Sequence, residues 1–420
     1  MAHADHIIVG LDLGSVKTCA LVCEPNEEGK LEVMGIGVAE SKGWRKGLIV
    51  NLDLTVLAVK KAVEAAETAA GVSIESAYVG VAGSHIKGVN SRGSVTLAKS
   101  AAAAREVERE DVRRVIQTAQ SITLPEDRQL LHVLPQKFLL DSQDGIRDPV
   151  GMMGACLEVD VHLVTASASA TQNVVTAVNR AGVVVQDTVF EPLASGEACL
   201  TADERELGVA LVDIGGSSTD LAVYHGGVVR HTGVIPVGGE HFTNDIAVGL
   251  RTPIPEAEKM KKAWGERDPS KPADTVLEVP GVGERPSRIV NYAMLSEVIE
   301  PRAVELMELI QSELGRSGCE KQLGAGVVLT GGGATLGGLA GLAEQTLGLA
   351  VRAGAPVEIA SMGETLADPA FATVVGLAIH GNRLRLRRDS RESSGLFGKL
   401  WKSVRGKSAR DTGQRSHHGE

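Results

Sequence analysis

Residues 7–22, IIVGLDLGSVKTCALV, consist of two apolar runs rich in β-branched residues, separated by a glycine-centred turn. Residues 209–224, VALVDIGGSSTDLAVY, repeat this arrangement 201 positions further along the chain. Each segment therefore predicts a strand, a tight turn and a second strand. The matched positions are Asp12 and Asp213, Gly14 and Gly215, and Thr18 and Thr219. Two such hairpins half a chain apart predict a duplicated α/β domain with a cleft between its halves.

The first turn differs from a P-loop, because Val16 stands where that motif requires its second glycine. A single turn of this kind is commonly no more than a hairpin. Two in register favour a phosphate site, since glycine lets the backbone approach a ligand and hydroxyl and N–H groups can face the cleft. The predicted phosphate-binding residues are Gly14, Ser15 and Lys17 on one side, and Gly215, Gly216, Ser217, Ser218 and Thr219 on the other. Asp12 and Asp213, at the strand ends, are candidates for binding Mg²⁺ directly or through water.

A third glycine cluster lies in VVLTGGGATLGG, which begins at Val327. It predicts a buried strand, a turn, and a helix that begins near Leu336 and whose N-terminus offers free N–H groups. The turn glycines Gly331, Gly332 and Gly333 are expected to form a flat surface against a base or ribose.

Gly238 and Gly239 precede another predicted helix, on which Glu258 and Lys261 are three residues apart and so share one face. This pair is a candidate for contacting a ribose and base. A solvated ion pair is the alternative interpretation.

Composition excludes several classes of protein. With 420 residues, 43% of them hydrophobic, the chain can bury a large core. Its five cysteines include no C-x-x-C pair, which argues against a disulfide framework or a zinc site. The N-terminus lacks the pattern of a signal peptide, and no apolar run is long enough to span a bilayer. Aromatic residues make up 3% of the chain, which does not fit a nucleic-acid binder. We therefore expect a protein on the cytoplasmic side of the membrane.

The C-terminal tail is basic, although the whole chain has a net charge of −10. Residues 381–415 contain eleven Lys and Arg against three Asp and Glu, which predicts an anionic partner for the tail. Within it, GLFGKLWKSVRG at 395–406 has the pattern of an amphipathic helix. Its apolar residues are Leu396, Phe397, Leu400, Trp401 and Val404, and its basic residues are Lys399, Lys402 and Arg405. At roughly 16 Å this helix is too short to cross a bilayer, so we expect it to lie in an anionic membrane surface. Docking on its own domain or in the groove of a partner protein remain alternatives.

The order of these motifs resembles the superfamily of actin, heat-shock protein 70 and the sugar kinases. Two Asp-x-Gly hairpins are joined by FEPLASGEA, around Glu191, and are followed by the glycine-rich turn. More narrowly, GVAGSHIKGVNSRGSV, HVLPQKFLLDSQDGIRDPVGMMG, LSEVIEPRAVELMELI and the tail resemble the bacterial cell-division family FtsA, from residue 7 to about residue 406. The resemblance implies an actin-like, duplicated ribonuclease-H-like α/β fold with two inserted subdomains and a C-terminal amphipathic helix.

The resemblance also implies a division of the chain. The first half comprises 1–82 and 162–195 with a returning helix at 368–381, and the second comprises 196–233 and 298–367. One insertion, 83–161, begins with the hairpin-like HIKGVNSRGSVTLA, and the other is 234–297. Residues 382–394 are expected to be a disordered linker before the helix at 395–406, and 407–420 a disordered tail.

The resemblance implies an ATP- and Mg²⁺-binding scaffold that forms filaments, partly through the insertion at 83–161. It also implies binding to the C-terminal peptide of the tubulin-like protein FtsZ, tethering of the Z ring to the inner face of the cell membrane, and recruitment of other division proteins. Candidate FtsZ-binding residues are Arg288, Glu297 and Glu300, although these side chains fit a solvated helix face equally well.

Hydrolysis of ATP is expected to be slow at most. Glu191 is the candidate for orienting the attacking water, and packing of the crossing between the two halves is its alternative role. The other functional class, a small-molecule kinase, requires a carboxylate base beside an acceptor pocket. No sequence motif marks such a pocket.

Overall fold

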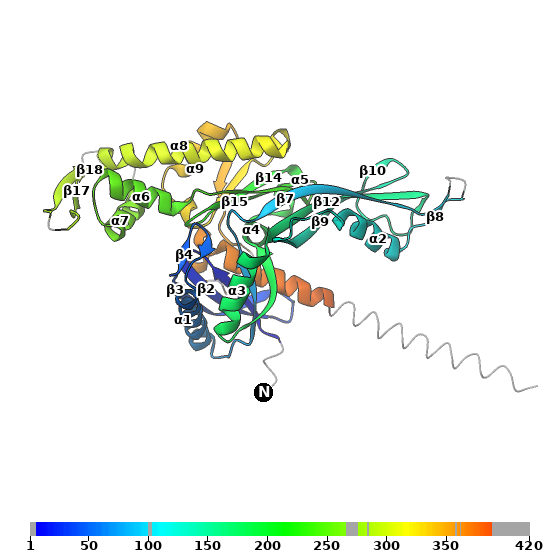
Figure 1. The fold of residues 1–420 in the computed structure, drawn as a ribbon, viewed down its shortest axis with the longest axis horizontal. Coiled ribbons are helices and arrows are strands. Elements are labelled where there is room, and N and C mark those ends of the chain that lie inside the picture. Colours follow the sequence, from blue (N-terminus) through cyan, green and yellow to red (C-terminus); the bar gives the residue numbers. More distant parts are fainter. Residues whose placement is uncertain are drawn as a thin grey trace, which may run out of the picture.

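The computed structural model describes residues 6–99, 103–265, 276–283, 285–357, 359–361 and 363–388. Two five-stranded sheets form the centre of the molecule, and each is built around one of the repeated hairpins. A four-stranded sheet extends from the centre in one direction, and a helical insertion extends in the other (Figure 1). The protein is therefore a duplicated α/β core with two additions on opposite sides.

The first central sheet has the strand order β13-β6-β1-β2-β3. Its strands are β1 (Ile8–Leu13), β2 (Lys17–Pro25), β3 (Leu31–Glu40), β6 (Ser76–Val81) and β13 (Val184–Phe190). Strands β1 to β3 are antiparallel, whereas β6 runs parallel to β1 and to β13. Helices α1 (Leu52–Ala70) and α3 (Ala168–Arg180) cover one face. Helix α1 can approach closely because β3 has glycine beneath it: a Cβ added at Gly37 would lie 2.0 Å from the Ala62 carbonyl oxygen.

The second central sheet repeats this topology in the order β16-β15-β14-β19-β20. Its strands are β14 (Val209–Ile214), β15 (Thr219–His225), β16 (Val228–Ile235), β19 (Val327–Thr330) and β20 (Val351–Ala353). Strands β14 to β16 are antiparallel, and β19 is parallel to β14 and to β20, as in the first sheet. The duplication predicted from the repeated hairpins is confirmed.

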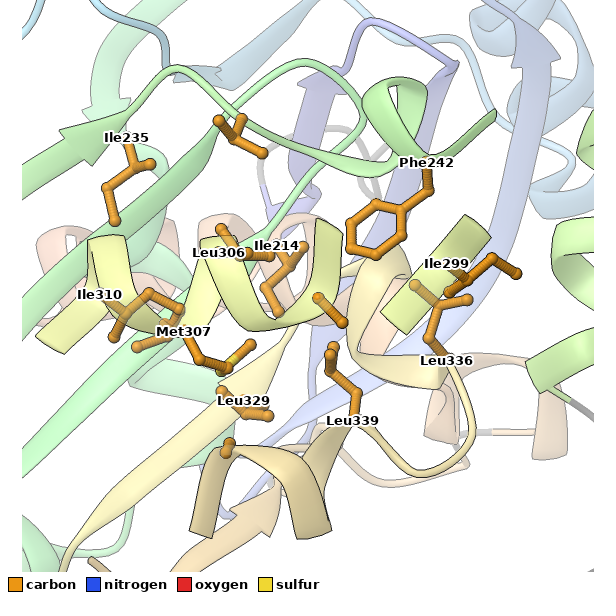
Figure 2. Packing of buried hydrophobic residues seen from close by; sticks show 14 of the residues in the cluster. Ile214, Ile235, Phe242, Ile299, Leu306, Met307, Ile310, Leu329, Leu336 and Leu339 are labelled. Carbon is orange, nitrogen blue, oxygen red and sulfur yellow. The ribbon is translucent and has the colours of Figure 1, made fainter. Parts of the chain in front are cut away.

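Helix α8 (Tyr292–Ser317) lies across the outer face of the second sheet, beside α9 (Leu339–Leu347). Figure 2 shows Leu306, Met307 and Ile310 of α8 facing the sheet residue Leu329. The inner faces of the two sheets pack against α4 (Glu191–Cys199) and a C-terminal helix over residues 372–388. These two helices cross so closely that a Cβ added at Gly376 would lie 1.8 Å from a backbone carbonyl oxygen of α4.

The insertion after β6 is an antiparallel sheet in the order β10-β9-β12-β7, with α2 (Arg109–Gln120) packed on it. Its strands are β7 (Lys87–Thr96), β9 (Arg128–Leu140), β10 (Gln143–Ile146) and β12 (Cys156–Ser167). The hairpin predicted at its start is wrong, because β7 runs unbroken along β12. Gly93 makes room for a helix instead of a turn: a Cβ there would lie 2.3 Å from the Val115 carbonyl oxygen of α2.

The second insertion contains α6 (Gly239–Gly249), α7 (Ile254–Gly265), β17 (Val276–Val279) and β18 (Arg288–Asn291). Strands β17 and β18 pair antiparallel, and β18 leads directly into α8. The smaller elements are β4 (Trp44–Arg45), β5 (Leu48–Ile49), β8 (Arg105–Glu106), β11 (Met153–Gly154), α5 (Ala202–Leu207), η3 (Glu320–Gln322), η4 (Gly332–Thr335), η5 (Glu364–Ala367) and η6 (Pro369–Phe371).

The C-terminal helix is longer than predicted, since residues 382–388, expected in a linker, continue it. Side chains on this stretch bind the core: Asn382 Nδ2 donates to the Gly29 carbonyl oxygen over 3.0 Å, and Arg383 forms an ion pair with Glu197. The predicted amphipathic helix at 395–406 lies outside the described residues. Among the residues that are described, no helix is both long and apolar enough to cross a bilayer.

Candidate functional site

The turns of the two repeated hairpins face each other between the halves of the core. A Cβ added at Gly216 would lie 2.5 Å from Val16 Cγ2 and 2.6 Å from Ser15 Oγ. Tertiary structure therefore brings together two turns that are 201 positions apart in sequence. Glycine at position 216 is required for this close approach, because a side chain there would collide with the opposite turn.

A cavity of about 280 Å³ lies at this junction. Predicted residues in its lining are Gly14, Ser15, Glu191, Asp213 and residues 215–218. Three further segments that sequence reasoning missed also line it: the β4–β5 hairpin with Trp44, the end of β6 and the loop after it with His85, and the N-terminus of α3 with Ser167. The buried atoms Trp44 Nε1 and His85 Nδ1 have no hydrogen-bond partner among the described residues. The cavity is therefore lined by segments from both halves of the core.

The second hairpin is fixed by the N-terminus of α6. The backbone N–H groups of Gly239 and Glu240 donate to the carbonyl oxygens of Gly215 and Gly216, over 2.9 and 2.8 Å. A Cβ added at Gly238 would lie 2.7 Å from the same two oxygens. Gly238 and Gly239 thus support the turn of the second hairpin from behind.

Three carboxyl groups line the cavity, those of Glu191, Asp213 and Asp220, and the buried Asp12 lies on β1 just before the first turn. Burial raises the pKa of Asp12 to about 7, against the attraction of Lys17, and Asp213 raises it further. Burial also raises the pKa of Asp220 to about 7 and that of Glu191 well above its usual value. The site therefore gathers carboxyl groups whose ionisation is disfavoured by burial, and a bound cation would favour their charged form.

Asp220 is a site residue that the repeat comparison passed over. Its carboxylate accepts a hydrogen bond from Ser218 Oγ over 2.8 Å and from the Gly83 N–H over 3.4 Å, which links the two halves of the core. The matching position in the first repeat holds Cys19. The two repeats share no acid at this position, so their similarity does not mark Asp220 as a site residue.

Asp213 is held by hydroxyl groups from two helices. Its Oδ2 accepts hydrogen bonds from Ser195 Oγ of α4 over 2.6 Å and from Thr373 Oγ1 of the C-terminal helix over 3.2 Å. The two hydroxyl oxygens are 3.0 Å apart. Neither partner was predicted: Ser195 lies within FEPLASGEA, where only Glu191 was given a role, and Thr373 is 160 positions from Asp213 in the sequence.

Lys17, predicted to bind phosphate, is turned toward an aromatic ring. Its Nζ lies 3.5 Å from the centroid of the Phe371 ring, a cation–π contact. Among the described residues that line the cavity, Gly14 and Ser15 of the same turn are present and Lys17 is not. The Lys17 ammonium still lies near enough to Asp12 and Asp213 for its positive charge to lower the pKa of both carboxyl groups.

The third glycine turn lies against the second hairpin. Gly331 has φ +80°, and a Cβ there would lie 2.2 Å from Asp213 Oδ1. Its N–H donates to the Pro369 carbonyl oxygen over 3.2 Å, so it is not free for a ligand. The predicted start of the following helix, near Leu336, is wrong, because α9 begins at Leu339. The 3₁₀ turn η4, which contains Gly332 and Gly333, precedes it. Gly337 and Gly338 delay the helix, because Gly338 has φ +78° directly before Leu339.

Glu258 and Lys261 share one face of α7, as their spacing predicted, and Lys261 Nζ lies 2.7 Å from Glu258 Oε2. The pair is not simply solvated: only 14% of the Lys261 side chain is exposed, and its Nζ also contacts the Gly239 carbonyl oxygen and Thr243 Oγ1. Neither residue lines the described cavity. The pair therefore supports the N-terminus of α6, next to the turn of the second hairpin.

The predicted partner-binding residues lie on the second insertion and α8. Arg288 belongs to β18, and its guanidinium donates to the Leu250 carbonyl oxygen. Glu297 and Glu300 are exposed on α8. Exposed apolar side chains occur on the same insertion, among them Ile289 at 73% and Val248 at 78% exposure.

Two sheets of identical topology that carry facing Asp-x-Gly turns define an actin-like fold. Solved structures with this fold resemble the chain: the PilM–PilN type IV pilus biogenesis complex (TM-score 0.64, 20% identity, 89% of this chain and 98% of that one) and MreB5 of Spiroplasma citri bound to ADP (TM-score 0.54, 13% identity, 91% and 98%). The models of two families, "Cell division protein FtsA" and "SHS2 domain inserted in FTSA", match residues 210–376 and 83–165.

The chain is 44% identical over 376 residues to the cell division protein FtsA of Pseudomonas aeruginosa, covering 89% of both sequences. It is 40% identical over 392 residues to the FtsA of Escherichia coli K12, covering 91% of this chain and 92% of the relative. The chain belongs to the FtsA family of actin-like cell-division proteins.

Proposed function

We propose that the cleft binds ATP with Mg²⁺, and that the protein uses the nucleotide as a scaffold in cell division. The observation that carries this proposal is the pair of facing turns at a 280 Å³ cavity lined by backbone and hydroxyl groups. Gly14 and Ser15 would contact the phosphates from one side, and residues 215–218 from the other. The actin-like neighbour MreB5 was solved bound to ADP, which supports a nucleotide in a fold of this kind.

The buried acids support a divalent cation in the same site. Polyphosphate is strongly anionic, so it would be repelled by Asp12, Asp213 and Asp220 unless a cation lay between them. In the described part of the chain, no three His, Cys, Asp or Glu residues are close enough together to hold a metal ion alone. Phosphate oxygens and water would therefore complete the coordination that Asp12 and Asp213 begin, as is usual for Mg²⁺.

Glu191 stands in a suitable place to act on water beside the phosphates. It begins α4, lines the cavity, and packs over β6, where a Cβ added at Gly80 would lie 3.1 Å from Glu191 Oε1. Burial and the neighbouring carboxylates raise its pKa, which favours the protonated acid, and that form cannot accept a proton from water until a cation lowers the pKa again. This supports slow ATP hydrolysis at most.

The second insertion is the proposed docking surface for the C-terminal peptide of FtsZ. It combines exposed Ile289 and Val248 with the charged groups of Arg288, Glu297 and Glu300, and such a mixture fits a short peptide with both apolar and charged residues. The remaining functions that we propose are filament formation, recruitment of other division proteins, and attachment to anionic lipid through residues 395–406. A location at the division site, on the inner face of the cell membrane, follows from these functions.

Cosedimentation with vesicles tests the proposal as a whole. The full chain is mixed with Mg·ATP, FtsZ, and either anionic or neutral vesicles. We expect the chain to pellet with anionic vesicles, and FtsZ to pellet only when the chain is present. FtsZ lacking its C-terminal peptide is the matched control and should stay in the supernatant. Pelleting of FtsZ without that peptide, or of the chain equally with neutral vesicles, would contradict the proposed contacts.

A further inference from the structure

A short segment, Pro369–Thr373, contacts all three glycine turns of the cleft. Phe371 lies under the Lys17 ammonium of the first hairpin, with 3.5 Å between Nζ and the ring centroid. Thr373 Oγ1 donates to Asp213 at the start of the second hairpin. The carbonyl oxygen of Pro369 accepts the Gly331 N–H of the third turn. In the described part of the chain, no other segment makes hydrogen bonds or ring contacts to Lys17, Asp213 and Gly331 together.

The same segment begins the C-terminal helix. The 3₁₀ turn η6 ends at Phe371, and the α-helix over 372–388 follows without a break. Asp368 caps the turn by accepting the Ala370 N–H over 2.7 Å. Because the turn is capped and continuous with the helix, a backbone shift at Phe371 would be passed on to the first helical turn.

Lys17 has two competing partners in this arrangement. In the structure its ammonium contacts the Phe371 ring, outside the described lining of the cavity. A polyphosphate in the cavity attracts the same ammonium with formal charges, whereas an aromatic ring offers only its quadrupole. The ammonium should therefore leave the ring, or carry it along, when the cleft is occupied.

We propose that Pro369–Thr373 senses an occupied cleft, with Phe371 as the positioning residue that holds Lys17 when no polyphosphate is bound. This inference rests on the proposed nucleotide site. When the cleft is occupied, the Lys17 ammonium moves toward the polyphosphate. The Phe371 ring then either moves with it or loses the cation–π contact, and the packing of the first turn of the helix 372–388 changes. By thermodynamic reciprocity, loosening the Phe371 contact favours polyphosphate binding.

The test uses Phe371→Leu, which keeps an apolar side chain but removes the ring, and Phe371→Tyr, which keeps the ring. Affinity for Mg·ATP is measured by calorimetry, and amide hydrogen exchange of residues 372–378 is measured with and without Mg·ATP. In the wild type we expect Mg·ATP to change exchange in this turn by about twofold or more. Phe371→Leu should bind Mg·ATP about 2- to 5-fold more tightly, the reciprocal of a partly exposed cation–π contact, and should lose the exchange response. Phe371→Tyr should behave as the wild type does.

Phe138→Leu is the matched control, since Phe138 is a buried phenylalanine of the inserted sheet. It should change neither the affinity nor the response. Normal Mg·ATP binding by the wild type with unchanged exchange in 372–378 overturns this inference and leaves the proposed nucleotide site standing. Weaker or equal binding by Phe371→Leu also overturns it, because a merely structural role predicts that result. Failure of the wild type to bind Mg·ATP overturns the proposed function itself, and the inference with it.

Discussion

Replacement of Asp213 by alanine separates binding from folding at the centre of the cleft. The carboxylate lines the cavity and is the proposed Mg²⁺ contact of the second hairpin. Loss of one charge-assisted contact costs roughly 1.5–3 kcal/mol, which corresponds to an affinity for Mg·ATP about 10- to 150-fold weaker. We therefore expect Asp213→Ala to bind Mg·ATP at least about tenfold more weakly than the wild type.

The fold should tolerate this change. Burial raises the pKa of Asp213, which means that a charged carboxylate at this position destabilises the native state, and alanine removes this destabilisation. The two hydroxyl groups left behind, of Ser195 and Thr373, are 3.0 Å apart and can bond to each other. We expect the free energy of unfolding to change by less than about 2 kcal/mol, because the lost hydrogen bonds and the relieved burial offset each other.

Calorimetric titration with Mg·ATP and urea unfolding are measured on the same preparation. Asp203→Ala is the matched control, because Asp203 is an exposed acid in the first turn of α5, away from the cavity. It should leave the affinity unchanged. An Asp213→Ala protein that is folded and binds Mg·ATP as tightly as the wild type would refute the assignment of the second hairpin to the nucleotide.

Four further changes test other parts of the structure. Gly376→Ala should lower the free energy of unfolding by about 3 kcal/mol or more in urea denaturation, because the added Cβ would lie 1.8 Å from a backbone oxygen of α4. Gly341→Ala is the control and should not lower it, because a Cβ at Gly341 would meet no atom within 4 Å. Burial lowers the pKa of His162 to about 4, so between pH 7 and pH 5 the imidazole is protonated in the unfolded chain but stays neutral in the native state, and the native state is destabilised as the pH falls. His162→Gln should remove about 2 kcal/mol of this acid destabilisation, measured by urea unfolding at the two pH values. Arg288→Glu should weaken binding of the FtsZ C-terminal peptide in fluorescence anisotropy while leaving Mg·ATP affinity unchanged, and equal peptide binding would place the surface elsewhere. Trp401→Glu should abolish flotation with anionic vesicles, because it puts a charge among the apolar residues of the tail, and retained flotation would exclude the membrane-surface helix.

The sequence alone determined the duplicated core. Apolar runs on either side of Asp12 and of Asp213 specify the two hairpins, because strand pairing and tight turns depend on residues close together in the chain. The same locality explains why the spacing of Glu258 and Lys261 predicted a shared helix face. The local pattern gave a wrong hairpin where a glycine allows a helix to pack closely and does not form a turn, as at Gly93 beneath α2.

Only the tertiary structure decided which distant groups complete the cleft. Ser195, Phe371 and Thr373 lie outside the two hairpins, and they meet Asp213 or Lys17 because the sheets and the C-terminal helix pack together. The end of that helix was likewise set by contacts that Asn382 and Arg383 make with residues far away in the chain. Hydrogen bonds and ring contacts depend on separation in space, and a one-dimensional pattern specifies that separation only within a single strand, turn or helix.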